Sequence, residues 1–185
     1  MATRQAPLPT FEIVFENTFV LKGELYPGLA PNSVGSFIHL ANSGFYDGAV
    51  ILDAEEDALL QIDHPTEKAP YCIEGEMLLN DCTYNTGTLS YGAMCMYHPN
   101  GCYAERSRFM IVLHNHMRSL HLFGADYAFF GQVLEGMNLA VLLSRNSRDH
   151  ITYERIYHRI KTIRVDTHGR EYPFKTIPVP EGYSG

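Results

Sequence analysis

The chain opens with an alternation of apolar and polar positions that predicts two β-strands. Two runs rich in Val, Phe and Leu, Phe11 to Phe15 and Phe19 to Tyr26, are separated by Glu16-Asn17. β-Branched and aromatic residues favour extended backbone, and a short polar break between two such runs is typical of an antiparallel hairpin. We therefore expect these two strands to pair with each other.

A helical pattern follows the hairpin. Pro31-Asn32-Ser33 suits the first turn of a helix, where the N–H that proline lacks would have no partner within the helix. Apolar residues then recur at intervals of three and four and share one face, and they are Val34, Phe37, Ile38 and Ala41. Gly44 is placed to end this helix. A second, shorter helix is expected over Leu139 to Leu143, before the polar residues 144–148.

Short strands and turns are expected between the two helices. This pattern runs from Ala49 to about Met77 and is followed by the apolar run Thr88 to Met96. Phe109 to Leu113 is apolar without interruption, as expected of a strand buried on both faces or of a barrel wall. Ile160 to Val165 alternates like a closing strand. The chain is therefore predicted to be mainly β with two helices.

The length of 185 residues fits one domain, and no internal repeat is visible. We assign residues 11–166 to that domain and residues 1–10 to a short N-terminal extension. Residues 167–185 include Pro173, Pro178 and Pro180 among scattered polar residues. We therefore expect them to form an extended C-terminal tail that packs loosely on the domain.

Composition and charge disfavour several classes of protein. With 45% hydrophobic and 12% aromatic residues, the chain suits a packed globular domain. Its net charge of −7 and pI near 5.7 disfavour nucleic-acid binding, which needs clustered Lys and Arg. The N-terminus lacks the apolar run of a signal peptide, and no stretch has the roughly 18 apolar residues of a membrane helix. We expect a cytoplasmic protein without nucleic-acid or membrane partners, and we favour a monomer.

The cysteines and histidines give little support to a metal or redox site. The four cysteines form no C-x-x-C pair and read as ordinary thiols: Cys72, Cys82, Cys95 and Cys102. His114, His116 and His121 would bind zinc only if a turn brought them together. The acidic run at 53–57 lacks the pattern of a calcium loop. We expect no metal and no cofactor.

Three stretches of the chain, taken in order, resemble the bacterial cyclophilins. They are Glu24-Leu25-Tyr26-Pro27 with Ala30-Pro31-Asn32-Ser33-Val34, then Gly44-Phe45-Tyr46-Asp47-Gly48, then Phe130-Gly131-Gln132-Val133 with Glu135-Gly136-Met137-Asn138. Shorter matches lie between them, at Gly75-Glu76, Gly87-Thr88-Leu89-Ser90 and Ser107-Arg108-Phe109-Met110-Ile111. Each stretch alone is weak, but their order and spacing make the combination specific from about Phe11 to Val165.

The resemblance implies both a fold and an activity. The fold is a closed eight-stranded antiparallel barrel with a helix at each end. The activity is cis/trans isomerisation of the peptide bond before proline, in a shallow groove on the outer barrel wall and without a cofactor. Amide resonance gives this bond a barrier of about 18–20 kcal/mol. In the family an arginine donates a hydrogen bond toward the prolyl nitrogen and an apolar pocket holds the ring, so that the twisted bond is stabilised.

Several groove positions of that family carry different residues here. Counted without gaps from the Gly-Phe-Tyr-Asp-Gly stretch, the arginine position falls on Asp53. The Phe-Met pair of the pocket falls on Ala58 and Leu59, whereas Gln61 keeps the family's glutamine. An ionised carboxylate only accepts hydrogen bonds, so Asp53 cannot replace the arginine. The missing rings at Ala58 and Met110 should weaken proline binding by about 1–3 kcal/mol.

Arg108 occupies a position that is glutamine in the family's Ser-Gln-Phe-Phe pattern. Because an arginine is lost at Asp53 and gained at Arg108, we hypothesise an ion pair between them in the groove, with two unrelated surface charges as the alternative. The loops Met94 to Glu105 and Leu113 to Ser119 are longer than usual. Two interpretations stay open: added binding surface, or extra loop length that is merely tolerated. Further groove positions implied by the resemblance are Gly92, Ala93, His121, Leu122 and Tyr127.

These residues favour a divergent cyclophilin-like domain that binds proline-containing peptide or protein segments and has weak or lost isomerase activity. Two alternatives stay open. In the first, Arg108 supplies the missing donor and leaves a residually active isomerase that assists protein folding. In the second, the proline-bearing segment Tyr172 to Pro180 fills the groove of a non-catalytic structural domain.

Overall fold

The computed structural model describes residues 6–88, 90–99, 102–114 and 126–183. Its helices are α1 (Pro31–Asn42) and α3 (Met137–Arg145), with a short 3-10 turn, η1, at Leu78–Asn80. Its strands are β1 (Thr10–Phe15), β2 (Val20–Leu25), β3 (Val50–Glu55), β4 (Leu59–Asp63), β5 (Ile73–Glu74), β6 (Ala93–Met96), β7 (Ala104–Glu105), β8 (Phe109–Val112), β9 (Phe129–Glu135) and β10 (Ile160–Asp166). The prediction of a mainly β chain with two helices is confirmed.

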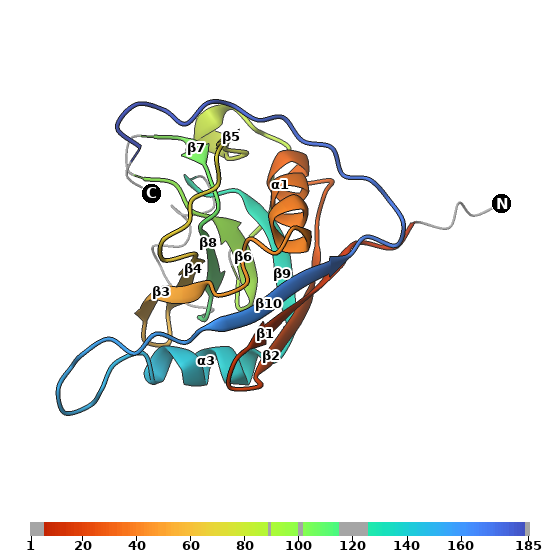
Figure 1. Cartoon of the computed structure of the whole chain (residues 1–185). Helices are drawn as coiled ribbons and strands as arrows, with labels where there is room; N and C mark the ends of the chain where they lie inside the picture. Colours follow the sequence, from red (N-terminus) through yellow and green to blue (C-terminus); the bar gives the residue numbers. More distant parts are fainter. Residues whose placement is uncertain (1–5, 89, 100–101, 115–125, 184–185) are drawn as a thin grey trace.

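Eight of these strands form one antiparallel sheet. Their order is β10-β1-β2-β9-β6-β8-β4-β3, and β5 pairs separately with β7. The predicted N-terminal hairpin is present as β1 and β2, where Ile13 lies opposite Leu21. In Figure 1 the sheet lies between the helices, with α1 at its upper end and α3 at its lower end.

The two edge strands of the sheet, β3 and β10, approach each other without a continuous ladder. Val50 makes an isolated antiparallel bridge with Arg159, just before β10. The Ile160 N–H donates to the Ala49 carbonyl at 2.7 Å, and the Gly48 N–H donates to the Ile160 carbonyl at 2.9 Å. These contacts hold the edges together, while complete closure of the barrel stays a prediction.

The main core lies between α1 and the inner face of the sheet. The Phe37 ring of α1 has centroid distances of 5.3 Å to Phe109, 5.2 Å to Phe130 and 5.6 Å to Tyr46. All four rings are fully buried, and tilted or edge contacts of this kind are favourable for aromatic side chains. The apolar face predicted for α1 and the buried strand predicted at β8 are both confirmed.

Two elements differ in length from the prediction because of glycines with positive φ. Gly136, at φ 87°, leads directly into α3, which therefore begins at Met137 and not at Leu139. β6 covers Ala93–Met96 and not the whole apolar run from Thr88. Gly92, at φ 84°, bends the chain immediately before β6, so Ser90 and Tyr91 do not continue the strand.

The C-terminal tail has no helix or strand among its described residues, but its packing is closer than expected. The Lys175 N–H donates to the side chain of Asn32 at 2.9 Å, and Ile177 makes an antiparallel bridge with Cys72. The Tyr183 ring lies 5.9 Å below the Arg106 guanidinium. The expectation of loose packing is wrong, because several separate contacts fix the tail over α1 and β5.

Candidate functional site

A row of cross-strand partners crosses the outer face of the sheet. In the observed register Asp53 of β3 lies opposite Gln61 of β4, and Gln61 lies opposite Met110 of β8. Met110 in turn lies opposite Cys95 of β6, which is paired with Phe129 of β9. Directly opposed residues project from the same face of a sheet. Three of the predicted site residues, Asp53, Gln61 and Met110, are therefore brought together.

The apolar end of this row belongs to a second core, which we call the outer cluster. Its buried members are Ala93, Cys95, Met110, Val112 and Phe129. The residues between them along β6 and β8 face the main core instead, as the alternation of a strand requires. Met110 retains only 4% exposure. The outer cluster is therefore a packed apolar surface and not an open hydrophobic patch.

Aromatic side chains pack against the outer cluster from several segments of the chain. The Tyr26 ring stacks on Phe129 with centroids 5.4 Å apart, and Tyr97 and Tyr127 also contact the cluster. The predicted site residue Tyr127 thus lies at the same surface as Met110. His121 and Leu122 lie outside the described residues.

The remaining predicted site residues lie at the ends of the strands that carry the row. Leu59 is opposite Val112, and the Ala58 carbonyl accepts the Leu113 N–H at 2.8 Å. The Gly92 N–H donates to Val112, and the Gly92 carbonyl accepts from Val133, both at 2.8 Å. These backbone groups of Gly92 are therefore occupied by neighbouring strands.

The ion pair predicted between Asp53 and Arg108 is wrong. Both residues lie in the described part of the chain, and the Asp53 carboxylate instead binds Arg155, with Nη2 and Oδ1 2.9 Å apart. The Arg108 guanidinium lies over the Tyr97 ring, 4.6 Å from its centroid. A cation held over an aromatic face is stabilised by the ring's quadrupole, which explains why Arg108 does not cross to Asp53.

Arg155 is a contact of Asp53 that sequence reasoning missed. It also donates from Nη1 to the carbonyl of Leu52. Leu52 is the extra residue of a β-bulge between Ile51 and Asp53, and the extra residue of a bulge has no ladder partner. Arg155 is 102 residues from Asp53 in sequence, so only the fold brings the two together.

A buried pair of carboxyl groups lies at the N-terminus of α1. Glu76 accepts the Asn32 and Ser33 N–H groups at 3.1 and 2.8 Å, where the helix dipole favours negative charge. The Ser33 hydroxyl lies 2.9 Å from Glu76 and 3.1 Å from Glu105. Complete burial, with the nearby Glu76 charge, raises the pKa of Glu105 well above its ordinary value of 4.5. This pair supports α1 and lies apart from the outer row.

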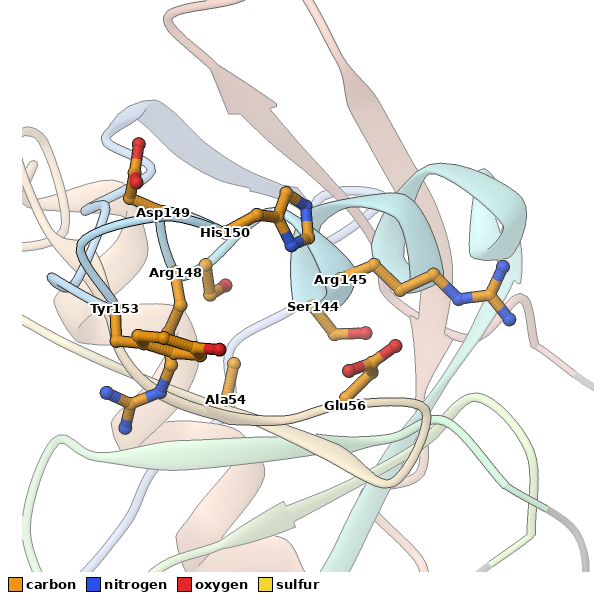
Figure 2. A pocket seen from close by; sticks show the side chains of 9 residues that line it. Ala54, Glu56, Ser144, Arg145, Arg148, Asp149, His150 and Tyr153 are labelled. Carbon is orange, nitrogen blue, oxygen red and sulfur yellow. The ribbon is translucent and has the colours of Figure 1, made fainter.

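A cavity of about 230 Å³ lies near the Asp53 end of the row, between the turn after β3, the end of α3 and the following loop (Figure 2). Its lining includes Ala54, Glu56, Ser144, Ser147, Arg148, His150 and Tyr153. The Ser144 and Ser147 hydroxyls donate to helix carbonyls at 2.8 and 2.7 Å. These serines therefore stabilise the end of α3 and are not activated as nucleophiles.

Metal and membrane sites can be tested only in the described parts of the chain. There, no three His, Cys, Asp or Glu side chains are grouped so that they could hold a metal ion. His116 and His121 of the possible zinc trio lie outside those parts. No helix within them is long and apolar enough to cross a membrane.

Comparison with known proteins agrees with this geometry. Residues 11–166 match the family described as "Cyclophilin type peptidyl-prolyl cis-trans isomerase/CLD". The chain is 33% identical over 141 residues to peptidyl-prolyl cis-trans isomerase B of Bacillus subtilis (strain 168), covering 74% of this chain and 92% of the relative.

Solved structures share the fold at lower identity. A Cryptosporidium parvum cyclophilin-type peptidyl-prolyl cis-trans isomerase, crystallised in the presence of the dipeptide Ala-Pro, has a TM-score of 0.68 at 17% identity. That match covers 85% of this chain and 98% of the other. The Mimivirus cyclophilin has a TM-score of 0.63 at 15% identity, covering 89% and 92%. The fold, the row on its outer wall and the family match over residues 11–166 together show that this chain belongs to the cyclophilin-type peptidyl-prolyl cis-trans isomerase family.

Proposed function

We propose that this chain binds proline-containing peptide or protein segments on the outer wall of the sheet, with weak or lost isomerase activity. The observation that carries the proposal is the row from Asp53 through Gln61 to Met110. It places a carboxylate, an amide and an apolar side chain side by side in a chain of this family. An amide can bind a peptide backbone and an apolar surface can hold a proline ring.

The weak activity follows from the chemistry of the carboxylate. Twisting the bond before proline removes amide resonance, and a donor directed at the prolyl nitrogen stabilises the twisted state. Asp53 has no proton to donate when it is ionised, and its carboxylate already accepts hydrogen bonds from Arg155 and from the Ala54 N–H. Residue 53 therefore contributes no donor of its own to the reaction.

The apolar part of the row supports binding more than it supports catalysis. Leu59 is only partly buried and offers a branched apolar side chain, whereas Met110 is almost fully buried beneath the surface of the row. Ala58 adds no ring. We expect proline-containing segments to bind with modest affinity, because ring packing worth roughly 1 kcal/mol or more is missing.

The two alternatives from the sequence receive different support. Arg108 lies over Tyr97 beside the outer cluster, and its Nε has no partner in the described part of the chain, but no contact found there directs it at Gln61 or Met110. The described tail residues contact Asn32, Cys72 and Arg106, so their contacts do not support a tail that fills the outer wall. Peptide binding in trans remains the function that the geometry favours.

An NMR titration tests the proposal directly. A short peptide with one Ala-Pro bond is added to the labelled protein, and its Ala-Ala analogue is the comparison. We expect shift changes at the Gln61 side-chain amide and the Met110 methyl with the proline peptide, and much weaker changes with the analogue.

Two variants show whether the binding surface is the outer row. Gln61→Ala should weaken binding of the proline peptide severalfold, because it removes an amide from the wall. Asn138→Ala, which removes an exposed amide from α3, should leave it unchanged. Equal binding of both peptides, or shift changes confined to residues away from the row, would contradict the proposal.

A further inference from the structure

The loop between α3 and β10, residues 146–159, carries a patch of exposed apolar side chains. In Figure 1 this loop extends beyond the sheet near β3. Ile151 is 87% exposed, Tyr153 73%, Tyr157 56% and Ile156 42%. Single exposed apolar side chains are ordinary in soluble proteins, but four so close together in the sequence form a patch, and such patches mark interaction sites.

Hydrogen bonds within the loop hold this patch in a defined conformation. Arg148 and Arg155 form an antiparallel bridge across the base of the loop. Nearer the tip, the Asp149 carboxylate accepts the Ile151 and Thr152 N–H groups at 2.8 and 2.7 Å. A loop that is fixed in this way loses little conformational freedom when a partner covers it.

Tyr153, at the tip of the loop, has a left-handed backbone conformation with φ 59°. A residue with a side chain adopts this conformation only at a cost, and residues of this kind concentrate at sites that bind a ligand or a partner. The Tyr153 N–H donates to the Asp149 carbonyl at 2.9 Å, which holds the turn in place. The loop therefore keeps an exposed aromatic ring in a fixed position.

The cavity shown in Figure 2 lies beside these side chains and has a volume of about 230 Å³. His150 and Tyr153 of the loop line it together with Ala54 and Glu56 of the β3–β4 turn. Ile151 follows His150 in the chain but is not part of the lining. A cavity of about 150 Å³ can hold a benzene-sized group, so this cavity has room for a branched apolar side chain.

Charges of both signs surround the patch. Arg148 and His150 of the loop are exposed, and so are Glu55 and Glu56 of the β3–β4 turn. Within the part of the chain that the structure describes, none of these four belongs to an ion pair. Two copies that each carry a net charge of −7 repel one another overall, so a contact between them needs a local pairing of opposite charges such as this one can supply.

We propose that this patch is an interface between two copies of the chain, in which Ile151 of each copy enters the cavity of the other. Contact about a two-fold axis is reciprocal, because both subunits use the same patch. The protruding side chain and the cavity lie next to each other, as such a contact needs. Arg148 of one copy then faces Glu55 and Glu56 of the other. This interface revises the monomer that the sequence favoured, and it does not depend on the proposed peptide binding.

The size of the patch predicts a weak dimer. A fully covered aromatic side chain buries about 150–250 Å², and on that scale the exposed parts of the four apolar side chains amount to roughly 400–500 Å² per copy. Standard interfaces bury about 800 Å² per partner, and smaller ones belong to transient complexes. We therefore expect a dimer that forms only at high protein concentration.

Sedimentation equilibrium of the full chain, from about 5 to about 500 µM, tests this interface. The average mass should rise from 20.9 kDa toward twice that value as the concentration increases. Ile151→Glu would place a carboxylate inside the partner's cavity, so it should weaken association roughly 10-fold or more. Because Ile151 is 87% exposed, the substitution should not disturb the fold of the single chain.

Leu79→Glu is the matched control. Leu79 is 50% exposed in η1 and lies outside the patch, so this variant should associate like the wild type. Charge exchange tests the pairing across the interface. Arg148→Glu should weaken association severalfold, and the double variant Arg148→Glu with Glu56→Arg should recover it, because opposite charges meet again.

Three results would overturn the proposal. The first is a mass of 20.9 kDa at every concentration, and the second is equal association of the wild type and Ile151→Glu. The third is a mass that rises beyond two chains, since a reciprocal contact closes at the dimer. A chain that stays monomeric but binds vesicles of phosphatidylserine and phosphatidylcholine through Ile151 would show that the patch contacts a lipid surface instead.

Discussion

Glu105 illustrates at the scale of one residue how burial decides the state of a side chain. It is fully buried in β7, and the Ser33 hydroxyl lies 3.1 Å from one of its carboxyl oxygens. Its other oxygen, Oε1, has no hydrogen-bond partner in the described part of the chain. Removing an ionised carboxylate from water is unfavourable, so the folded protein retains the Glu105 proton to a higher pH than the unfolded chain does.

This raised pKa predicts that the stability falls as the pH rises. Above the ordinary pKa of 4.5, the unfolded carboxyl loses its proton while the folded one keeps it. The folded state then binds more protons, so the free energy of unfolding decreases with pH until the folded pKa is reached. Glu105→Gln has no such proton. Its melting temperature relative to wild type should increase as the pH rises above 4.5.

Thermal unfolding of both proteins at several pH values checks this prediction. A gain of 1 kcal/mol in a chain of this size corresponds to roughly 2–4 °C, which is easily measured. If the difference in melting temperature between the two proteins stays constant across the pH range, burial does not raise the pKa of Glu105 and the prediction fails.

Single residues also mark where sequence reasoning was sufficient and where it was not. Counting from one short motif placed Asp53 and Gln61 in a groove, and a second motif placed Met110 there; the register brings these three together. The same counting could not find Arg155, because its contact with Asp53 depends on the path of a loop 102 residues away. The proposed partner Arg108 was wrong because Tyr97 holds it, and nothing in the local pattern shows that ring contact.

At the scale of elements, the packing of the tail on α1 is the feature that periodicity did not reveal. Gly35, in the middle of α1, has no side chain, and the tail passes close to it. A Cβ atom at this position would lie 2.7 Å from the Tyr172 carbonyl oxygen and 2.9 Å from the Phe174 Cβ. The glycine therefore permits close contact between the helix and the tail.

Gly35→Ala separates two opposing effects. In an exposed helix the change should stabilise by roughly 0.5–1 kcal/mol, because alanine restricts the unfolded chain more than glycine does. Here the added methyl group meets backbone that Lys175 and Ile177 hold in place. Overpacking of this kind costs about 1–3 kcal/mol, so we expect net destabilisation in urea unfolding.

The control for this substitution is Gly28→Ala, where a Cβ atom would have no neighbour within 4 Å. It should leave stability almost unchanged. A Gly35→Ala protein that is more stable than the wild type would show that the tail packs loosely, as the sequence first suggested.

At the scale of the whole molecule, the positions of the strands along the chain were easier to predict than the way in which the strands join into a barrel. Apolar periodicity located β1, β2, β10 and both helices, because burial of one face repeats along each of them, and an uninterrupted apolar run located β8, which is buried on both faces. The order of strands in the sheet and the single bridge between Val50 and Arg159 depend on contacts distant in sequence. The resemblance to a family implied eight antiparallel strands in a barrel but not their order in the sheet, which local patterns do not contain either.

The whole chain combines the fold of an isomerase family with an outer wall that, in our proposal, lacks the family's donor. The family match spans residues 11–166, yet the wall bears a carboxylate at position 53 and a guanidinium from a different segment. A fold alone does not determine activity, which depends on the donors that face the substrate. The central claim is that Asp53, at the position of the family's arginine, preserves peptide binding and lowers isomerase activity.

The most direct test compares two rates of cis/trans exchange for one Ala-Pro peptide. One is measured with this chain and the other with the Bacillus subtilis relative, at equal substoichiometric concentration and under the same conditions. Loss of a well-placed donor lowers the rate by roughly 100-fold or more, and we expect a difference of that size. Exchange by this chain as fast as that of the relative would contradict the account.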